Sequence, residues 1–435
     1  MLTSERPVAV TRALGFWTAV ALVMGNMIGS GVFLLPASLA PFGGLGLGGW
    51  LISTAGAVLL ALVFARLSRL NPAAGGPYAY TRQAFGDLAG FLVAWGYWIS
   101  VWCANAALAV ALVGYLDPFV PGLVRHPASA AMIAVGAVWL LTGVNVWGVR
   151  SAGRVQVVTT ALKILPLVLI GVAGTFALDP SHFAVASTGA GSIARGLTSS
   201  ATLTLWAFLG LECATIPAGS IRDADRTIPR ATVIGALMAS FIYVTSTVGV
   251  IGVLEPSSLG QSTAPFADAA RVLFGDRAAG FVALGAAISC FGALNGWILI
   301  VGQVPLAAAN DGLFPSVFGR LSSRGTPASG MLIAGVLSTG LIATNYTRSL
   351  VDLFTFVILL ATLSTLVPYA FCALAGFLLA RQDARMQMSR AASAVAALAF
   401  AYAFWAIGGA GADVVYWGFL LLMSGLPVYA WTRRA

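Results

Sequence analysis

Two ionisable side chains, Lys163 and Glu212, fall within long apolar stretches of the sequence. An ionisable residue inside a membrane-spanning segment is costly and marks a functional site by default. Lys163 is the only lysine of the chain and lies about eight residues into its apolar stretch, roughly 12 Å deep at the helical rise. Its ammonium would reach the membrane interface only under strain. Three roles are open for Glu212: it could bind a cation directly, carry a proton, or brace a gate through hydrogen bonds.

The stretch GNMIGSGVF, residues 25–33, places glycines, Asn26 and Ser30 in the middle of an apolar run. A helix break within hydrocarbon leaves backbone groups unpaired, so it survives only where it lines a cavity or meets a ligand. The amides freed at the start of the second half-helix suit a carboxylate, and the freed carbonyls of the first half suit an ammonium. An α-amino acid carries both groups. Close helix packing through small residues is the alternative, but Asn26 and Ser30 favour a binding site.

A second polar interruption lies in LTLWAFLGLECATIPAG, residues 203–219, which includes Gly210, Glu212 and Thr215. Interrupted helices at corresponding positions of the two halves of a chain are typical of a transport site at the membrane midplane. A membrane enzyme would need a cluster of titratable or metal-binding groups, and the sequence offers no such cluster. We therefore expect a transporter and not an enzyme, with no cofactor and no metal ion.

The elements that must hold these residues are membrane helices. The chain has 435 residues, of which 59% are hydrophobic and 9% charged, and its mean hydropathy is +0.93. Because apolar stretches of about 20 residues are the expected unit, we predict an all-α integral membrane protein with a single transmembrane domain over residues 1–435. Its twelve predicted spans are 14–40, 45–68, 88–116, 128–148, 155–177, 196–219, 229–254, 279–308, 329–346, 350–380, 391–410 and 413–432. The loops between them are short.

The net charge of +9 is distributed unevenly over the predicted loops. Seventeen arginines fall in the amino-terminal tail, the carboxyl-terminal tail and the loops on the same side, whereas five fall in the loops on the opposite side. This imbalance is the positive-inside signal and predicts that both termini lie in the cytoplasm. The basic excess therefore sets topology. We expect a lipid bilayer and a small-molecule substrate as partners, and no nucleic acid.

Several motifs occur in the order known from one transporter superfamily: GNMIGSGVFLLPASLA (25–40), NPAAGGPYAYTRQAFG (71–86), TLWAFLGLE (204–212), GQVPLAAANDGLFP (302–315) and LVPY (366–369). In these motifs the chain resembles the amino acid–polyamine–organocation superfamily, and above all bacterial arginine/agmatine antiporters. The resemblance implies the leucine-transporter fold, with five-helix inverted repeats over about 14–177 and 196–380, spans 1 and 6 broken, and two further spans over 391–432. It also implies a protein of the bacterial inner membrane, often a homodimer.

The resemblance assigns the amino-acid end of the substrate to the two interruptions. The backbone of Ser30 and Gly31 would bind the carboxylate. Carbonyl groups near Met27, Trp206 and Leu209 would bind the α-amino group, and Trp206 would also act as a proximal gate.

The resemblance also implies positions for the substrate's side chain and for a distal gate. Trp297 would stack on the cationic end of the substrate, a contact worth roughly 0.5–2 kcal/mol, and Asn105 would hydrogen-bond that end. The alternatives are plain packing for Trp297 and a bond to a neighbouring helix for Asn105. Tyr97, Glu212 and Tyr369 would form the distal gate, and for Glu212 we favour proton-linked gating.

Lys163 departs from the pattern of the arginine/agmatine exchangers, which have an uncharged residue there. A lysine at this point of span 5 resembles instead the proton-coupled amino acid transporters and the heteromeric-type exchangers of the same superfamily. In those it lies beside the unwound part of span 1, where related transporters hold sodium. Its ammonium would then replace the ion and brace span 1 against span 8, or couple transport to protons. Tyr78, by contrast, matches a tyrosine that the family places on the cytoplasmic side.

Three pocket positions also differ from the pattern of the arginine exchangers. Where those proteins carry alanine, cysteine and serine, this chain has Ser100, Val101 and Ala361. The pocket could therefore fit a shorter cation or a neutral amino acid. We predict a secondary active transporter that exchanges a basic, arginine-like amino acid for its decarboxylated, agmatine-like amine by alternating access. Proton-coupled uptake of neutral or cationic amino acids is the alternative. A non-transporting amino acid sensor is an alternative from another class, and we would expect it to carry a soluble signalling domain.

Overall fold

A computed structural model describes residues 15–71, 75–147, 149–185, 190–216, 218, 221–344, 350–382 and 387–433. Within these residues the regular structure is helical, and no strand occurs there. The helices, with 3-10 helices marked η, are α1 (Phe16–Met27), α2 (Ser30–Leu39), η1 (Ala40–Phe42), α3 (Leu45–Leu70), α4 (Pro77–Phe85), α5 (Asp87–Leu116), α6 (Pro127–Trp147), α7 (Val149–Phe176), η2 (Pro180–Phe183), α8 (Ala190–Leu205), η3 (Trp206–Phe208), η4 (Cys213–Thr215), α9 (Ala224–Val253), α10 (Pro256–Leu259), α11 (Pro265–Phe274), α12 (Asp276–Asn310), η6 (Ser316–Gly319), α13 (Ala328–Thr344), α14 (Leu350–Gln382), α15 (Arg390–Gly409), α16 (Ala412–Met423) and α17 (Gly425–Thr432).

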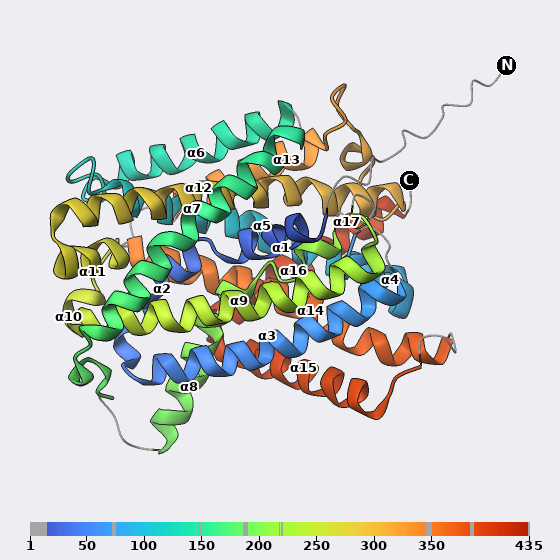
Figure 1. The fold of residues 1–435 in the computed structure, drawn as a ribbon. Helices are drawn as coiled ribbons and strands as arrows, with labels where there is room; N and C mark the ends of the chain where they lie inside the picture. The colour runs from blue at the N-terminus through green and yellow to red at the C-terminus, as the bar shows by residue number, and fades with distance from the viewer. Residues whose placement is uncertain are drawn as a thin grey trace.

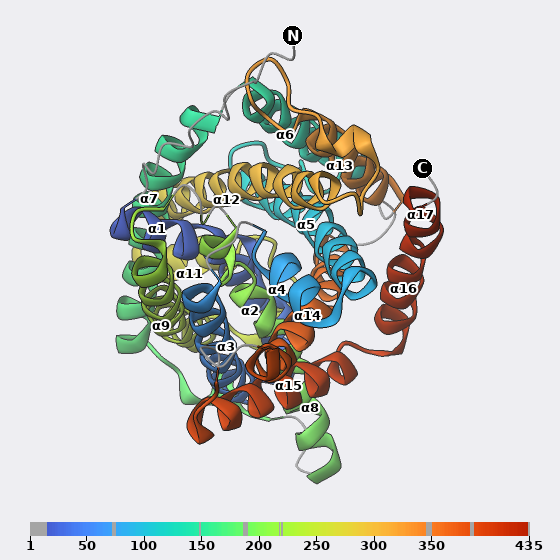
Figure 2. The ribbon, with the colours of Figure 1, turned by 90° about the vertical axis from the view of Figure 1, so that its right-hand side faces the viewer.

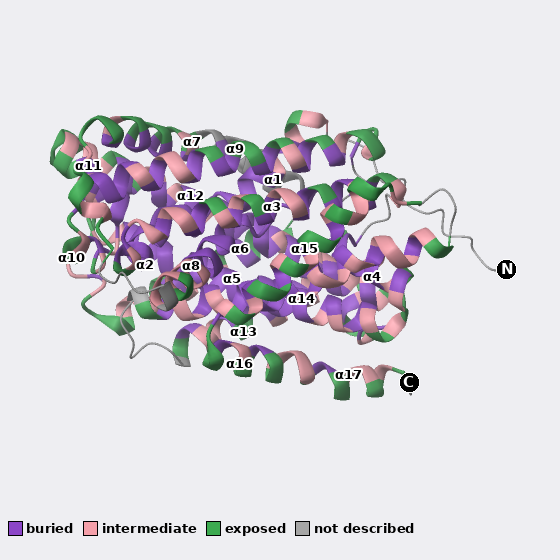
Figure 3. Ribbon diagram, turned by 90° about the horizontal axis from the view of Figure 1, so that it is seen from below, coloured by how far each residue is buried: buried purple, intermediate pink, exposed green. Residues whose placement is uncertain are grey.

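The long helices lie side by side as one bundle (Figure 1). α5 is its most buried long helix, with 94% of its most apolar segment inside the protein, and α12 and α14 pack against it. α16 and α17 lie at the periphery (Figure 2), where only 17% of the apolar segment is buried. Figure 3 shows the same gradient, from buried interior helices to outer helices with exposed residues along one side. The outer helices thus present apolar side chains outward, as a lipid-facing surface requires.

Nine helical segments of the described residues are long and apolar enough to cross a membrane. They coincide with nine of the predicted spans. The other three predicted spans, 155–177, 196–219 and 329–346, fall on α7, on α8 with η3 and η4, and on α13. The count of twelve spans stays a prediction, and residues 14, 148, 217, 219, 345 and 346 of those spans lie outside the described residues, as does the amino-terminal tail.

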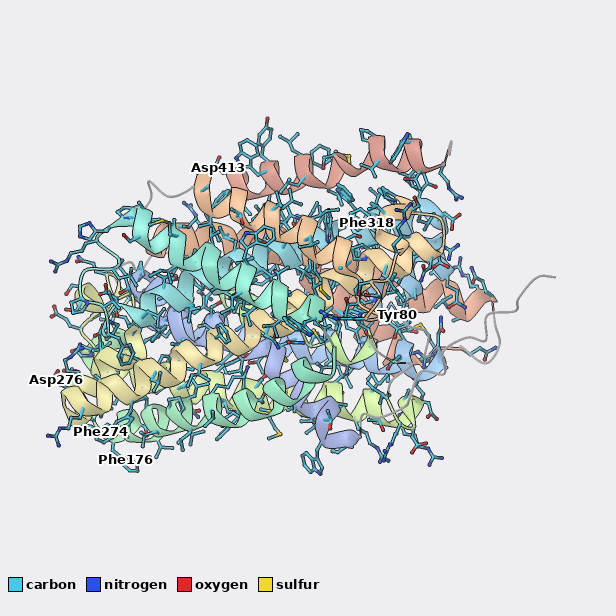
Figure 4. All side chains as sticks on the ribbon, turned by 90° about the horizontal axis from the view of Figure 1, so that it is seen from above. Tyr80, Phe176, Phe274, Asp276, Phe318 and Asp413 are labelled. Atoms are coloured by element: carbon cyan, nitrogen blue, oxygen red, sulfur yellow. The ribbon has the colours of Figure 1, made fainter. Side chains whose placement is uncertain are left out.

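The direction of the helices brings the middle of α7 close to the middle of α12. Figure 4 places Phe176, at the end of α7, at the same end of the bundle as Phe274 and Asp276, where α11 ends and α12 begins. Tyr80, in α4, lies toward the other half. α7 and α12 therefore run in opposite directions, and α7 packs against α12, α9 and α1.

Two helices are interrupted, where the sequence predicts it. α1 ends at Met27 and α2 begins at Ser30, so residues 28–29 interrupt the helix; we call these two residues together with residues 25–27, at the end of α1, the first break. Residues 209–212, between η3 and η4, form the second break. Within it Gly210 has a φ of +107°, a conformation that costs glycine little and other residues much.

Candidate functional site

Lys163 closes the carbonyl end of the first break. Its ammonium donates to the carbonyl oxygens of Gly25 and Ile28, each at 2.6 Å, and its side chain is fully buried. These carbonyls lie at the carboxyl end of α1, where the helix dipole favours a cation. The break is thus stabilised by a charge that α7 supplies.

The carbonyls between those two are also paired. The indole Nε1 of Trp297 donates to the carbonyl oxygen of Asn26 at 3.1 Å, and the amide of Gly29 donates to the carbonyl of Met27 at 3.0 Å. Each of the four carbonyls of residues 25–28 therefore has a donor from the protein. A carbonyl has two lone pairs, so the Met27 carbonyl, expected to bind the substrate's amino group, can still accept a second bond.

The amide end of the first break contacts the start of the second. An ideal Cβ on Gly31 would lie 3.0 Å from Cδ1 of Trp206 and 3.1 Å from Cα of Ala207. Ser30, the first residue of α2, is fully buried, and its hydroxyl has no hydrogen-bond partner among the described residues. The first amides of a helix have no intrahelical acceptor and favour an anion. The start of α2 therefore combines the unpaired hydroxyl of Ser30 with a close approach of Gly31 to Trp206.

The second break packs directly on the first. An ideal Cβ on Gly210 would lie 3.1 Å from Cβ of Asn26 and 3.2 Å from Cζ2 of Trp297. The hydroxyl of Tyr243, in α9, donates to the carbonyl of Ala207 at 2.9 Å, and the amide of Leu209 donates to the carbonyl of Trp206 at 3.1 Å. The two breaks therefore meet inside the bundle, around one tryptophan.

Glu212 is the centre of a buried hydrogen-bonded cluster. Tyr97 donates to its Oε1 and Tyr369 to its Oε2, and the amide of Gly210 approaches Oε2 at 3.3 Å. All three side chains of this cluster are buried. An ionised carboxylate only accepts, so the three donors suit that form, and a proton on Glu212 would require one tyrosine hydroxyl to reverse. The three residues predicted to form a distal gate are thus in contact.

A pair of hydroxyls joins α5 to α14 near this cluster. Ser100 and Thr365 hydrogen-bond each other, and Thr365 also donates to the carbonyl of Ala361 at 3.1 Å. Ser100 follows Tyr97 by three residues, and Thr365 precedes Tyr369 by four, so the pair lies about one helical turn from the cluster.

The remaining predicted pocket residues on α5 are buried. Val101 is 1% exposed and Asn105 is 1% exposed. The Asn105 side-chain oxygen has no hydrogen-bond partner in the part of the chain that the structure describes. Neither side-chain amide atom of Asn26 has a hydrogen-bond partner within the described ranges. Buried amide atoms of this kind are costly unless a ligand or water pairs them.

Tyr78 belongs to a separate polar cluster. Its hydroxyl donates to Asp311 at 2.7 Å, and Arg82 lies 2.8 Å from the same carboxylate and 2.9 Å from Asp87. Arg433, just beyond α17, pairs with Asp87. Burial, followed by the bond to Asp311, raises the pKa of Tyr78, so its hydroxyl remains a donor at neutral pH. These groups tie α4 to the end of α12, the start of α5 and the carboxyl-terminal helix.

Three partners in these contacts are absent from the sequence prediction: Tyr243, Thr365 and Asp311. Tyr243 and Thr365 are polar groups within apolar stretches, which is a signal that could have found them. Asp311 lies in the GQVPLAAANDGLFP motif, but its contact with Tyr78, 233 residues away, has no signature in a single sequence.

Within the described ranges, no group of three or more His, Cys, Asp and Glu side chains is placed to hold a metal ion. At the first break, the carbonyls of Gly25 and Ile28 that could hold a cation already bind the Lys163 ammonium.

Comparison with known proteins identifies the family of the chain. Residues 14–430 match the family model described as "Amino acid permease". The chain is 35% identical over 369 residues to the cadaverine/lysine antiporter of Escherichia coli K12, covering 83% of this chain and 82% of the relative. It is 35% identical to a Bacillus subtilis protein named "Putative arginine/ornithine antiporter", covering 96% of this chain and 97% of the relative. It is 29% identical to the putrescine transporter PotE of E. coli K12, covering 97% and 96%.

These names are those of transporters, and the apolar helices are those of a multi-pass membrane protein. The chain therefore belongs to the amino acid permease family of the amino acid–polyamine–organocation superfamily, with antiporters of basic amino acids and polyamines among its relatives.

Proposed function

We propose that this protein is an antiporter that exchanges a basic amino acid for its decarboxylated amine by alternating access. The single observation that supports this most is the meeting of the two breaks. The first turn of α2, whose amides have no intrahelical acceptor, packs against Trp206 at Gly31, while the carbonyls of residues 25–28 lie at the other side of the same break. That arrangement provides an anion site and a cation site a few residues apart.

In this proposal each candidate residue has one role. The amides of Ser30 and Gly31 bind the carboxylate, when the substrate has one. The carbonyls near Met27, Trp206 and Leu209 bind the amino group, and Trp206 closes over it. Tyr97, Glu212 and Tyr369 gate the site, Lys163 fixes the end of α1, and Tyr78 acts at the cytoplasmic end. The residues at the substrate's side chain are Asn26, Ser100, Val101, Asn105, Trp297 and Ala361.

Hydrogen-bond acceptors favour a substrate with a donor at its far end. The side-chain oxygen of Asn105 is buried and, among the described residues, has no donor. If Thr365 gives its proton to Ala361, Ser100 must give its own to Thr365, and the Ser100 oxygen can then only accept from a ligand. Ammonium and guanidinium groups are donors only. The relatives' names, which include lysine, cadaverine, ornithine and putrescine, support the same class.

Proton-coupled uptake of neutral or cationic amino acids is the second candidate. Lys163 favours it, because a buried amine that holds two carbonyls of the first break would hold them less strongly if it lost its proton.

Counterflow into proteoliposomes tests the proposal. Vesicles loaded with arginine, agmatine, lysine or putrescine, or left empty, are offered labelled arginine, agmatine, leucine or alanine. We expect uptake of the cationic substrates that requires a cationic substrate inside. Uptake into empty vesicles driven by a pH gradient would support the second candidate, and binding without any flux would indicate a sensor.

The wider organisation belongs to the same proposal. We propose a single transporter domain over residues 1–435, with twelve spans, inverted repeats over about 14–177 and 196–380, and further spans over 391–432. In this proposal the protein lies in the bacterial inner membrane, with both termini in the cytoplasm. Two copies form a homodimer through their outer helices. Cysteine-accessibility labelling at Arg125 and Arg320 would test the sidedness, with only the Arg125 position reacting from outside.

A further inference from the structure

The indole of Trp297 contacts both breaks through neighbouring atoms of its ring. Its Nε1 donates to the carbonyl of Asn26 at 3.1 Å, and its Cζ2 lies 3.2 Å from where a Cβ on Gly210 would stand. These two ring atoms are bonded to the same carbon, so both contacts fall on neighbouring atoms of the ring. Trp297 is 5% exposed, so the ring lies inside the bundle with its N–H bound to the protein.

Along the chain, the carbonyl that accepts the hydrogen bond from Trp297 lies between the two that accept from Lys163. Lys163 holds Gly25 and Ile28 from α7, and Trp297 holds Asn26 from α12. A buried carbonyl that loses its donor keeps the full cost of desolvation. The end of α1 is therefore fixed to two neighbouring helices, through one charged donor and one neutral donor.

The geometry points to a positioning role for Trp297 that is separate from any contact with substrate: its indole N–H fixes the end of α1 against the second break. This inference rests on the proposed function of the site, since it assigns the indole N–H to the protein and leaves the faces to a cationic substrate. Only residues 28–29 separate the end of α1 from Ser30, so this bond holds the first break against the second while the site alternates. The N–H then governs how fast the site alternates, and the faces govern how tightly it binds.

Replacing Trp297 by 3-benzothienylalanine tests this role, because sulfur takes the place of N–H and the two-ring shape is kept. We expect the affinity for arginine or agmatine to stay within about twofold of wild type, and the maximal exchange rate to fall about fivefold, the effect of one neutral hydrogen bond. Trp102 is the matched control: it is buried, and its Nε1 has no partner among the described residues. The same replacement there should change neither quantity. Unchanged rates for the Trp297 replacement, or equal losses of rate and affinity, would overturn the inference.

Hydrogen–deuterium exchange gives a second measurement that needs no substrate. With 3-benzothienylalanine in place of Trp297 we expect amides of residues 24–29 to exchange at least threefold faster than in wild type, while those of α16 are unchanged. Equal protection of residues 24–29 in both proteins would overturn the positioning role. If wild type shows no counterflow of cationic substrates, the proposed function fails, and the exchange experiment still decides the role of the N–H.

Discussion

The two breaks face the same problem, buried backbone groups without helical partners, and are stabilised in different ways. In the first break two residues separate the helices, and three of the four carbonyls of residues 25–28 are paired by side chains of other helices, Lys163 and Trp297. The second break is four residues long and relies mainly on its own short turns, including the approach of the Gly210 amide to the Glu212 carboxylate. The one bond from another helix is that of Tyr243, and it goes to the carbonyl of Ala207, in η3 just before the break. The first break is therefore stabilised by side chains of other helices, and the second mostly by hydrogen bonds within its own segment.

This difference indicates which break is fixed and which can respond. A break held by a buried ammonium and an indole cannot move without losing strong or costly bonds. A break built from local turns, with a carboxylate that two tyrosines contact, can rearrange by turning hydroxyls. We infer that the first break serves mainly as a frame for the substrate and that the second break is the one coupled to the gate.

The largest effect is expected for Lys163→Met. The substitution removes the donor to both Gly25 and Ile28 and leaves two buried carbonyls unpaired, which we expect to cost about 2–4 kcal/mol of stability. Exchange should slow by more than tenfold, and binding should weaken less. Thermal unfolding in detergent and counterflow measure the two effects. Leu165→Met, on the exposed side of the same helix, is the control. Wild-type turnover in Lys163→Met would mean that the first break is not held from outside.

Gly210→Ala is expected to be the next most damaging. Alanine at a φ of +107° is strained, and its Cβ would press on Asn26 and Trp297. We expect the free energy of unfolding to fall by about 2 kcal/mol and the affinity for all substrates to fall as well. Gly136→Ala is the matched control, because a Cβ there meets nothing within 4 Å and alanine favours a helix. Equal stability of the two variants would contradict the claim that the two breaks are in close contact.

Glu212→Gln tests whether the second break is the one coupled to the gate, because the substitution keeps the shape of the side chain and removes its charge. The amide has one acceptor oxygen, so one tyrosine must give up its role as donor. We expect exchange to become independent of pH between about 5 and 8, with a change in binding below threefold. Rates measured across that range in wild type and variant decide this. A variant with the wild-type pH profile would assign proton coupling to another group.

Tyr243→Phe should have the smallest effect. It removes one hydroxyl donor from the Ala207 carbonyl, a neutral hydrogen bond worth about 1 kcal/mol. Because the second break is mostly held by its own turns, we expect a small loss of stability and a change in exchange rate below fivefold. A loss as large as that of Lys163→Met would show that the second break also depends on an outside donor.

The positions of the breaks could be predicted from sequence because glycine, asparagine and serine are conspicuous in an apolar run. Lys163 was equally visible, as the only lysine, and its place beside the first break agrees with the expectation. What it binds could not be read directly, because its partners are main-chain carbonyls and every residue has one. The same reason hides the bond from Trp297 to Asn26: the family resemblance implies stacking by the ring face, and the sequence carries no sign of a bond from the indole N–H.

Contacts between helices that are distant in the sequence could not be predicted either. The hydroxyl pair of Ser100 and Thr365 requires the register of α5 against α14, which follows from packing over the whole bundle. The link from Tyr78 to Asp311 likewise requires α4 to lie against the end of α12. Apolar periodicity predicts helices and their length, but it does not fix which of them meet or at what depth.

A structure determined with bound arginine tests the central claim most directly. The account predicts that the carboxylate lies within hydrogen-bond distance of the Ser30 and Gly31 amides and the guanidinium against a face of Trp297, with Lys163 still on the carbonyls of Gly25 and Ile28. Arginine bound elsewhere, with both breaks closed to it, would contradict the claim that the breaks form the site.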